Sequence, residues 1–179
     1  MQSTLPEAEA FQSAVTALRH GDFTDSAPLF ADHSPSRPCS ILRWLREGRF
    51  SDAPDALAEA LTCACFLGET NVARELIASG VDAEAGMATG LNALHWAANR
   101  GQLATVRMLL ERNPPLETRN MYGGTVLSGT VWSAIHEPRP AQLEIIEELL
   151  RAGARVDAVD YPTGVEFIDR ILKQYGAGV

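Results

Sequence analysis

Two closely spaced cysteines and one histidine are the residues whose types best suit thiol or metal chemistry. Cys63 and Cys65 form a Cys-x-Cys pair, and His95 lies further along the chain. A thiolate next to an imidazole would make a nucleophile–base pair, or supply ligands for zinc. Positions i and i+2 of a helix point in different directions, so a helical segment keeps the two thiols from sharing one metal ion. A small metal or thiol enzyme built on Cys63, Cys65 and His95 is therefore the least favoured hypothesis.

The other candidates for catalysis lack the spacing that their chemistry requires. His20, His33 and His136 are scattered, and no His-Glu-x-x-His motif is present. The segment 123–125, Gly-Gly-Thr, is too short for a phosphate loop and lacks its Gly-Lys-Thr ending. The acidic pair at 147–148 is typical of a solvated helix face. We predict that the protein is not an enzyme and has no catalytic residues, no metal site and no cofactor.

Composition and charge narrow the class of partner. The chain has 179 residues, 46% of them hydrophobic and 21% charged, which is ordinary globular composition for one domain or a short repeat array. Its 15 basic and 23 acidic side chains give a formal charge of −8. Such a chain lacks the positive surface that binds nucleic-acid phosphates or anionic lipids. We therefore expect neither a nucleic acid nor a membrane as partner.

Targeting signals and cysteine usage favour a cytoplasmic protein. The longest apolar stretches are far too short to cross a bilayer, and the first residues lack the basic and apolar regions of a signal peptide. Three cysteines are an odd number and do not suggest a disulfide framework. We expect reduced thiols and a cytoplasmic location.

The elements that would position these residues follow from an internal repeat. Gly68 and Gly101 lie 33 residues apart, and this spacing also aligns apolar positions before and after them. A third copy ends in Gly153 at a spacing of 40 residues from Asn113, so it carries seven extra residues, which fall near 135–140. Each copy has apolar pairs at helical spacing, interrupted by glycine or asparagine turns, and no convincing strand alternation. The repeat predicts helix-turn-helix units stacked as an all-α solenoid.

The clearest copy resembles an ankyrin repeat, of the short kind familiar from bacterial proteins. Residues 94–101 read Leu-His-x-Ala-Ala-x-x-Gly, followed by the Val-x-x-Leu-Leu pattern of a second helix at 106–110. Asn92 and Ala93 replace the family's usual Thr-Pro. The resemblance implies an ankyrin-repeat solenoid, in which His95 binds backbone near the finger turns and ties neighbouring repeats together.

The resemblance covers roughly residues 54–171 and implies a domain organisation. Residues 1–53 match only vaguely, and we interpret them as a divergent helical N-terminal cap, since a terminal unit must cover one apolar face of the stack. Residues 54–179 contain the repeats. Their expected boundaries are 54–86, 87–119, 120–159 with the seven-residue insertion, and 160–179 as a partial C-terminal cap.

The family pattern also implies which positions face the concave groove. Several of them carry apolar or aromatic residues where polar ones are usual, and exposed aromatic side chains are typical of binding hot spots. The groove residues that we predict to bind a partner are Phe66, Leu91, Asn99, Arg100, Met121, Tyr122, Trp132 and Tyr161. The alternative is that the divergent repeats bury these rings. Trp132 is then the first candidate for burial, because the insertion begins just after it.

The sequence thus favours a non-enzymatic protein–protein interaction module. We expect it to bind a partner protein in the concave groove as a monomer and to act as an inhibitor, shield or adaptor. The alternative is a structural or self-associating repeat protein. The identity of the partner does not follow from the fold.

Overall fold

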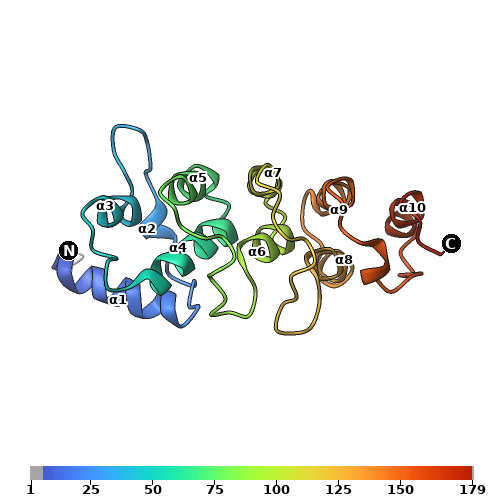
Figure 1. The fold of residues 1–179 in the computed structure, drawn as a ribbon, viewed down its shortest axis with the longest axis horizontal. Helices are drawn as coiled ribbons and strands as arrows, with labels where there is room; N and C mark the ends of the chain where they lie inside the picture. The colour runs from blue at the N-terminus through green and yellow to red at the C-terminus, as the bar shows by residue number, and fades with distance from the viewer. Residues whose placement is uncertain (1–5, 179) are drawn as a thin grey trace. The chain divides into compact units, whose positions relative to one another are not determined.

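The computed structural model describes residues 6–178 as an all-helical protein (Figure 1). Within that range there are ten α-helices, one short 3-10 helix and no β-strand. One isolated β-bridge joins Ser34 and Arg37 in the loop at residues 31–39. The predicted all-α repeat fold is confirmed.

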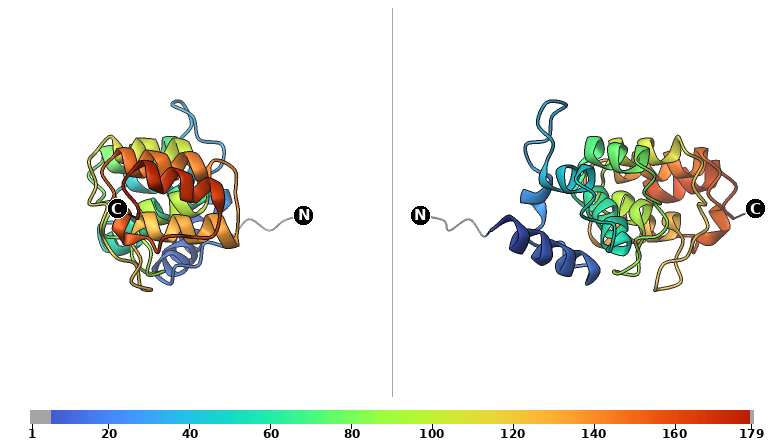
Figure 2. Two further views of the ribbon diagram at one scale, coloured as in Figure 1. Left: turned by 90° about the vertical axis from the view of Figure 1, so that its right-hand side faces the viewer. Right: turned by 60° about the vertical axis from the view of Figure 1, so that its left-hand side comes forward.

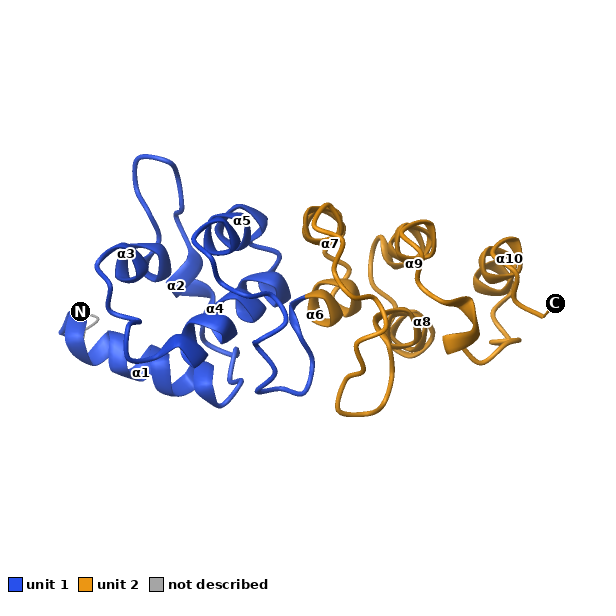
Figure 3. Ribbon diagram, in the orientation of Figure 1, with its two compact units in different colours: residues 1–93 blue, residues 94–179 orange. Residues whose placement is uncertain are grey.

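The chain divides into two compact units, coloured separately in Figure 3. Unit 1 comprises residues 1–93, and unit 2 comprises residues 94–179. The predicted N-terminal cap and the first predicted repeat therefore belong to one compact unit. The domain boundary expected between residues 53 and 54 lies between α3 and α4 and stays a prediction.

Unit 1 is organised around α4. Its helices are α1 (Glu7–Arg19), α2 (Ala27–Phe30), α3 (Ser40–Arg46), α4 (Pro54–Leu67) and α5 (Thr70–Ala78). α4 packs against both α1 and α5, and α3 packs against α2 and α5 (Figures 1 and 2). The ring of Phe11 meets Trp44 and Phe50 edge-on, each at 5.2 Å between centroids. All three rings are buried and pack together in the core of unit 1.

Unit 2 consists of successive helix pairs. Its elements are α6 (Ala93–Asn99), α7 (Leu103–Leu110), α8 (Val126–His136), α9 (Gln142–Arg151), η1 (Val156–Ala158) and α10 (Glu166–Gln174). α8 packs against α9, and α9 packs against α7, so the second helices of neighbouring pairs lie side by side (Figure 1). A long loop between α7 and α8 projects from the helices as a finger.

Glycines end the first helix of each regular pair, as the repeat predicts. Gly68 after α4 and Gly101 after α6 both have left-handed backbone angles, with φ of 80° and 75°. Such angles cost glycine little, because it has no Cβ to clash with the preceding turn. At Gly101 a second constraint applies: a Cβ there would lie 2.5 Å from the carbonyl oxygen of Pro140. The loop before α9 therefore packs directly on the end of α6.

The extra residues of the third repeat lengthen both a helix and a loop. α8 has 11 residues, whereas α6 has 7. Residues 137–141 then connect α8 to α9, with Ala141 in a left-handed conformation at φ 64°. The longer α8 and this loop distinguish the third pair from the second. No helix in the described part of the chain is long and apolar enough to cross a membrane.

Candidate functional site

The tip of the finger between α7 and α8 is a tightly hydrogen-bonded turn at residues 120–124. The side-chain oxygen of Asn120 accepts hydrogen bonds from the backbone N–H of Tyr122 at 2.9 Å and of Gly124 at 3.0 Å. The Asn120 N–H donates to the Gly124 carbonyl at 2.8 Å, and the Gly123 N–H donates to the Asn120 carbonyl at 2.9 Å. The guanidinium of Arg119 donates to the Gly123 carbonyl. These bonds fix the turn without using the side chains at its tip.

Those tip side chains are apolar and exposed. Met121 is 65% exposed and Tyr122 is 81% exposed. A fixed backbone beneath a free aromatic ring reduces the entropy lost when a partner covers the ring. The finger tip therefore has the features of a preorganised contact.

Trp132, on the C-terminal half of α8, is also exposed. It is 56% exposed, and its ring stacks on His136 with 4.6 Å between centroids. His136 lies one helical turn after Trp132, and its Nδ1 donates to the Trp132 carbonyl at 2.8 Å. This hydrogen bond holds the imidazole against the indole ring. The alternative, in which the divergent repeats bury this ring, is wrong for Trp132. His136, within the inserted segment, stacks on one face of the indole, whereas Arg139 and Pro140 pack on Gly101.

A small-residue position on α8 lies next to the finger. A Cβ at Gly129 would be 3.6 Å from the side-chain oxygen of Asn99 and 3.7 Å from the side-chain nitrogen of Asn120. Residues from α6, the finger and α8 thus meet at one place. The side-chain oxygen of Asn99 is buried there and has no hydrogen-bond partner among the described atoms. We name Met121, Tyr122 and Trp132 the finger–α8 surface.

A buried glutamine, which the sequence did not single out, holds the ends of α6 and α8 together. Gln142 is 2% exposed. Its Nε2 donates to the Asn99 carbonyl at 3.1 Å and to the Ser133 hydroxyl at 2.8 Å, and its Oε1 accepts from the Arg139 N–H at 2.7 Å. The Ser133 hydroxyl donates to the same Asn99 carbonyl at 3.2 Å. This network fixes the loop before α9 relative to both helices.

The remaining predicted groove residues have mixed surroundings. Leu91 is a correction: at 7% exposed it belongs to the core of unit 1 and offers no contact surface. Phe66, in unit 1, is partly buried and lies 5.7 Å from the ring of Phe23. In unit 2, Arg100 is partly buried at the end of α6, and the 37% exposed ring of Tyr161 covers Gly178.

The residues considered for thiol or metal chemistry are all buried. Burial raises the pKa of Cys63 to about 12 and raises the pKa of Cys65 as well, so both thiols remain protonated at neutral pH. Burial lowers the pKa of His95, against hydrogen bonds with the backbone of Gly124 and Thr118. Those bonds agree with the structural role that the family resemblance implies for this histidine. Within residues 6–178 no group of three or more His, Cys, Asp or Glu side chains is arranged to hold a metal ion.

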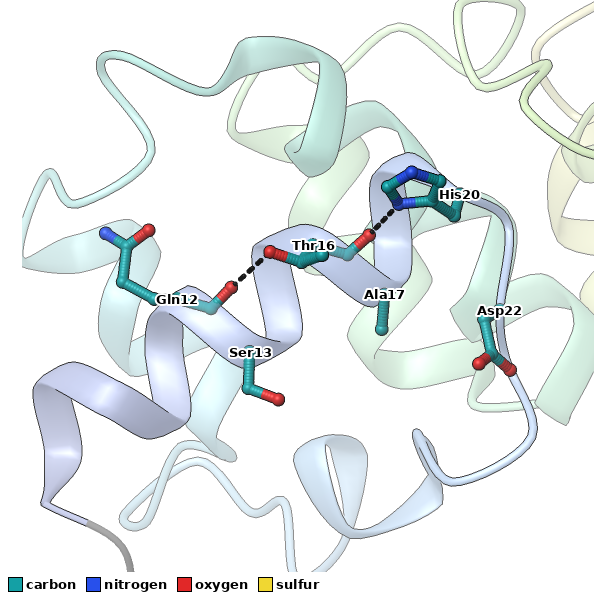
Figure 4. Close-up of a pocket in the computed structure, with 6 residues that line it drawn as sticks. All are labelled: Gln12, Ser13, Thr16, Ala17, His20 and Asp22. Atoms are coloured by element: carbon teal, nitrogen blue, oxygen red, sulfur yellow. Dashed lines mark hydrogen bonds between the residues drawn. The ribbon is translucent and has the colours of Figure 1, made fainter.

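A shallow hollow on α1 carries no functional argument. Figure 4 shows its lining residues, which are Gln12, Ser13, Thr16, Ala17, His20 and Asp22. The Thr16 hydroxyl donates to the Gln12 carbonyl at 3.0 Å, and Nδ1 of His20 binds the Thr16 carbonyl at 2.7 Å. Polar groups that already bind their own helix offer little to a ligand.

Comparison with known protein families identifies the class. A family model for ankyrin repeats (3 copies) matches residues 36–120 and again residues 61–160, which together span more than half of the chain. The chain belongs to the ankyrin-repeat family. No curated protein matches it significantly. Ankyrin repeats mediate protein–protein interaction, and proteins built from them are typically not enzymes.

Proposed function

We propose that this protein binds a partner protein through the finger–α8 surface and acts as an inhibitor, shield or adaptor without catalysis of its own. The observation that supports the proposal most strongly is the 81% exposed ring of Tyr122 on a turn fixed by backbone and Asn120 hydrogen bonds. Trp132 adds a second large exposed ring from α8 in the same unit. Tyrosine and tryptophan are the residues most enriched in binding hot spots.

Neighbouring residues of the predicted groove complete the proposed contact. Asn99 offers a buried carboxamide oxygen beside Gly129, and Arg100 follows it at the end of α6. Tyr161 lies further along unit 2 and would contact only a longer partner segment. Phe66 stays a predicted contact of unit 1. We propose that the protein acts as a monomer in the cytoplasm and that its partner is a protein rather than a nucleic acid.

The test is affinity capture from a native lysate with a double variant of the finger–α8 surface. Tyr122→Ala with Trp132→Ala removes both exposed rings and should abolish capture of a specific partner while the circular dichroism spectrum stays unchanged. Phe167→Ala with Tyr175→Ala is the matched control, because these rings are 54% and 38% exposed on or next to α10. Equal loss with both variants, or with neither, contradicts the proposal.

The mass of the protein in solution distinguishes self-association through the same surface from binding of a different protein. A dimer that the Tyr122→Ala, Trp132→Ala variant converts to a monomer would show that the rings bind a second copy. That result would replace the proposed function with the self-associating alternative.

A further inference from the structure

Two arginines come together near the C-terminal end of α8, which carries Trp132 of the finger–α8 surface. Arg100 directly follows α6, and Arg139 lies in the loop before α9. A Cβ at Gly101 would lie 3.3 Å from the Cβ of Arg139, so this loop lies against the residue that follows Arg100. Burial and the positive charge of Arg139 lower the pKa of Arg100, against the opposing charge of Glu137. The two guanidinium groups are therefore close enough to sense each other's charge.

Arg139 has hydrogen-bonding capacity that its surroundings do not use. Its backbone N–H is fixed by Gln142, which sets the position of the residue. Its Nη2 lies 3.5 Å from a carboxylate oxygen of Glu137, whose side chain is 60% exposed. Its Nε is buried and has no hydrogen-bond partner among the described atoms. The Arg139 side chain as a whole is 31% exposed, so a partner's acceptor can approach the guanidinium, although not its buried Nε.

The arginines are tied to the exposed rings by one hydrogen bond. The Ser133 hydroxyl donates to the Asn99 carbonyl, and these residues are the chain neighbours of Trp132 and Arg100. Arg119 approaches from the other side, since its guanidinium binds the Gly123 carbonyl of the finger. Cationic side chains thus flank α8, with Arg119 at the finger before it and Arg100 and Arg139 near its C-terminal end.

The segments around α8 carry a charge opposite to that of the whole protein. Residues 94–102 and 118–141 contain three arginines and one glutamate, whereas the full chain has a formal charge of −8. On α7 and α9 the arginines are balanced within the protein: Arg107 binds Glu144 at 2.6 Å and Glu148 at 2.8 Å, and Arg151 binds Glu148 at 3.1 Å. The local excess of positive charge at the finger–α8 surface calls for a complementary partner.

We propose that the partner docks an acidic segment here, with carboxylates between Arg100 and Arg139 and an apolar side chain against Tyr122 and Trp132. This inference rests on the proposed function and adds the chemistry of the partner to it. Guanidinium groups recognise carboxylates through paired hydrogen bonds. The insertion of the third repeat supplies Arg139, so this preference belongs to this chain and not to a regular repeat.

The test selects a displayed library of random 12-residue peptides on the immobilised full-length protein. We expect enrichment of peptides that combine aspartate or glutamate with a large apolar residue. Binding of the enriched peptide is then measured by fluorescence anisotropy. Arg139→Glu and Arg100→Glu should each weaken it by at least about tenfold, because each change replaces an attraction with a repulsion. Binding by the unmodified protein should also weaken as salt is raised.

A matched control carries the same charge change elsewhere in unit 2. The Arg170 side chain on α10 is 68% exposed and forms an ion pair at 2.9 Å with Glu166, one helical turn away. Arg170→Glu should therefore change the affinity less than about twofold. Circular dichroism checks that each variant is folded. The salt dependence of the unmodified protein provides a second readout that needs no variant.

The outcomes separate this inference from the proposed function. The selection could enrich peptides that have no acidic residues and whose binding is lost with Tyr122→Ala but kept with Arg139→Glu. That result would overturn the inference of an acidic partner segment and leave the proposed binding surface standing. Peptides insensitive to both substitutions, or no enrichment at all, would contradict both proposals. If Arg139→Glu and Arg170→Glu weakened the affinity for the peptide equally, the effect would come from the net charge of the protein and not from Arg139. That result would also overturn the inference.

Discussion

Replacing Gln142 by alanine tests whether one buried side chain holds α6, α8 and the intervening loop together. The substitution removes three hydrogen bonds, two donated by Nε2 and one accepted by Oε1. The Asn99 carbonyl keeps its bond from the Ser133 hydroxyl, but the Arg139 N–H loses its acceptor. At about 0.5–1.5 kcal/mol for each bond, the expected loss is about 2–4 kcal/mol in the free energy of unfolding.

Chemical denaturation and thermal melting both measure this loss. For a chain of this size, the loss corresponds to a decrease of roughly 5–12 °C in Tm. The control is Gln12→Ala on α1, because the Gln12 side chain is exposed and alanine favours the helix. We expect that control to leave the stability unchanged or slightly higher.

A double-mutant cycle with Ser133→Ala isolates the direct hydrogen bond. Nε2 of Gln142 and the Ser133 hydroxyl are 2.8 Å apart, so their coupling free energy should be about 0.5–1.5 kcal/mol. A Tm for Gln142→Ala within about 2 °C of the unmodified protein, or a coupling near zero, would refute the role given to this network.

Four further predictions concern stability. Gly86→Ala should destabilise by about 1–3 kcal/mol, because a Cβ there would lie 2.1 Å from the Thr62 hydroxyl. Gly129→Ala should stabilise by about 0.5–1 kcal/mol, since its Cβ has room and alanine is the better helix former. Denaturation midpoints of the two variants that shift in the same direction would contradict one of these two assignments. Burial raises the pKa of Glu59 above 4.5, against hydrogen bonds from Ala88 and Met87. The folded state then holds this proton more tightly, so stability falls as pH rises through the folded pKa, and Glu59→Gln should remove that slope. Burial lowers the pKa of His95 below 6.5, so its contribution is lost as pH falls below about 6.5; a His95→Gln variant with an unchanged slope in that range would show that His95 does not titrate there.

The regular part of the fold could be predicted because its signals are local. The Leu-His-x-Ala-Ala-x-x-Gly pattern identifies a helix and its glycine end within eight residues, and the period of 33 residues repeats the assignment. The all-α class and the ankyrin-repeat family therefore followed from the sequence. The same pattern predicted that His95 binds the backbone near the finger, and the structure has these hydrogen bonds at Gly124 and Thr118.

The candidate site was less predictable because side-chain exposure depends on distant packing. Leu91 occupies a groove position in the family pattern, yet it is 7% exposed in this structure. Trp132 stays exposed although His136 stacks on one face of its ring, whereas the rest of the inserted loop packs on Gly101, which lies far away in the sequence. Gln142 gave no signal at all, since its three partners become neighbours only when α6, α8 and the loop are assembled.

The finger turn separates the residues that shape it from those that a partner would touch. Asn120, Gly123 and Gly124 supply the hydrogen bonds of the turn, and none of those bonds uses the side chain of Met121 or Tyr122. Substitutions at positions 121 and 122 can therefore change what the protein recognises at little cost to folding. In the course of evolution, descendants of this chain could acquire new partners by drift at these two codons while the scaffold is inherited unchanged.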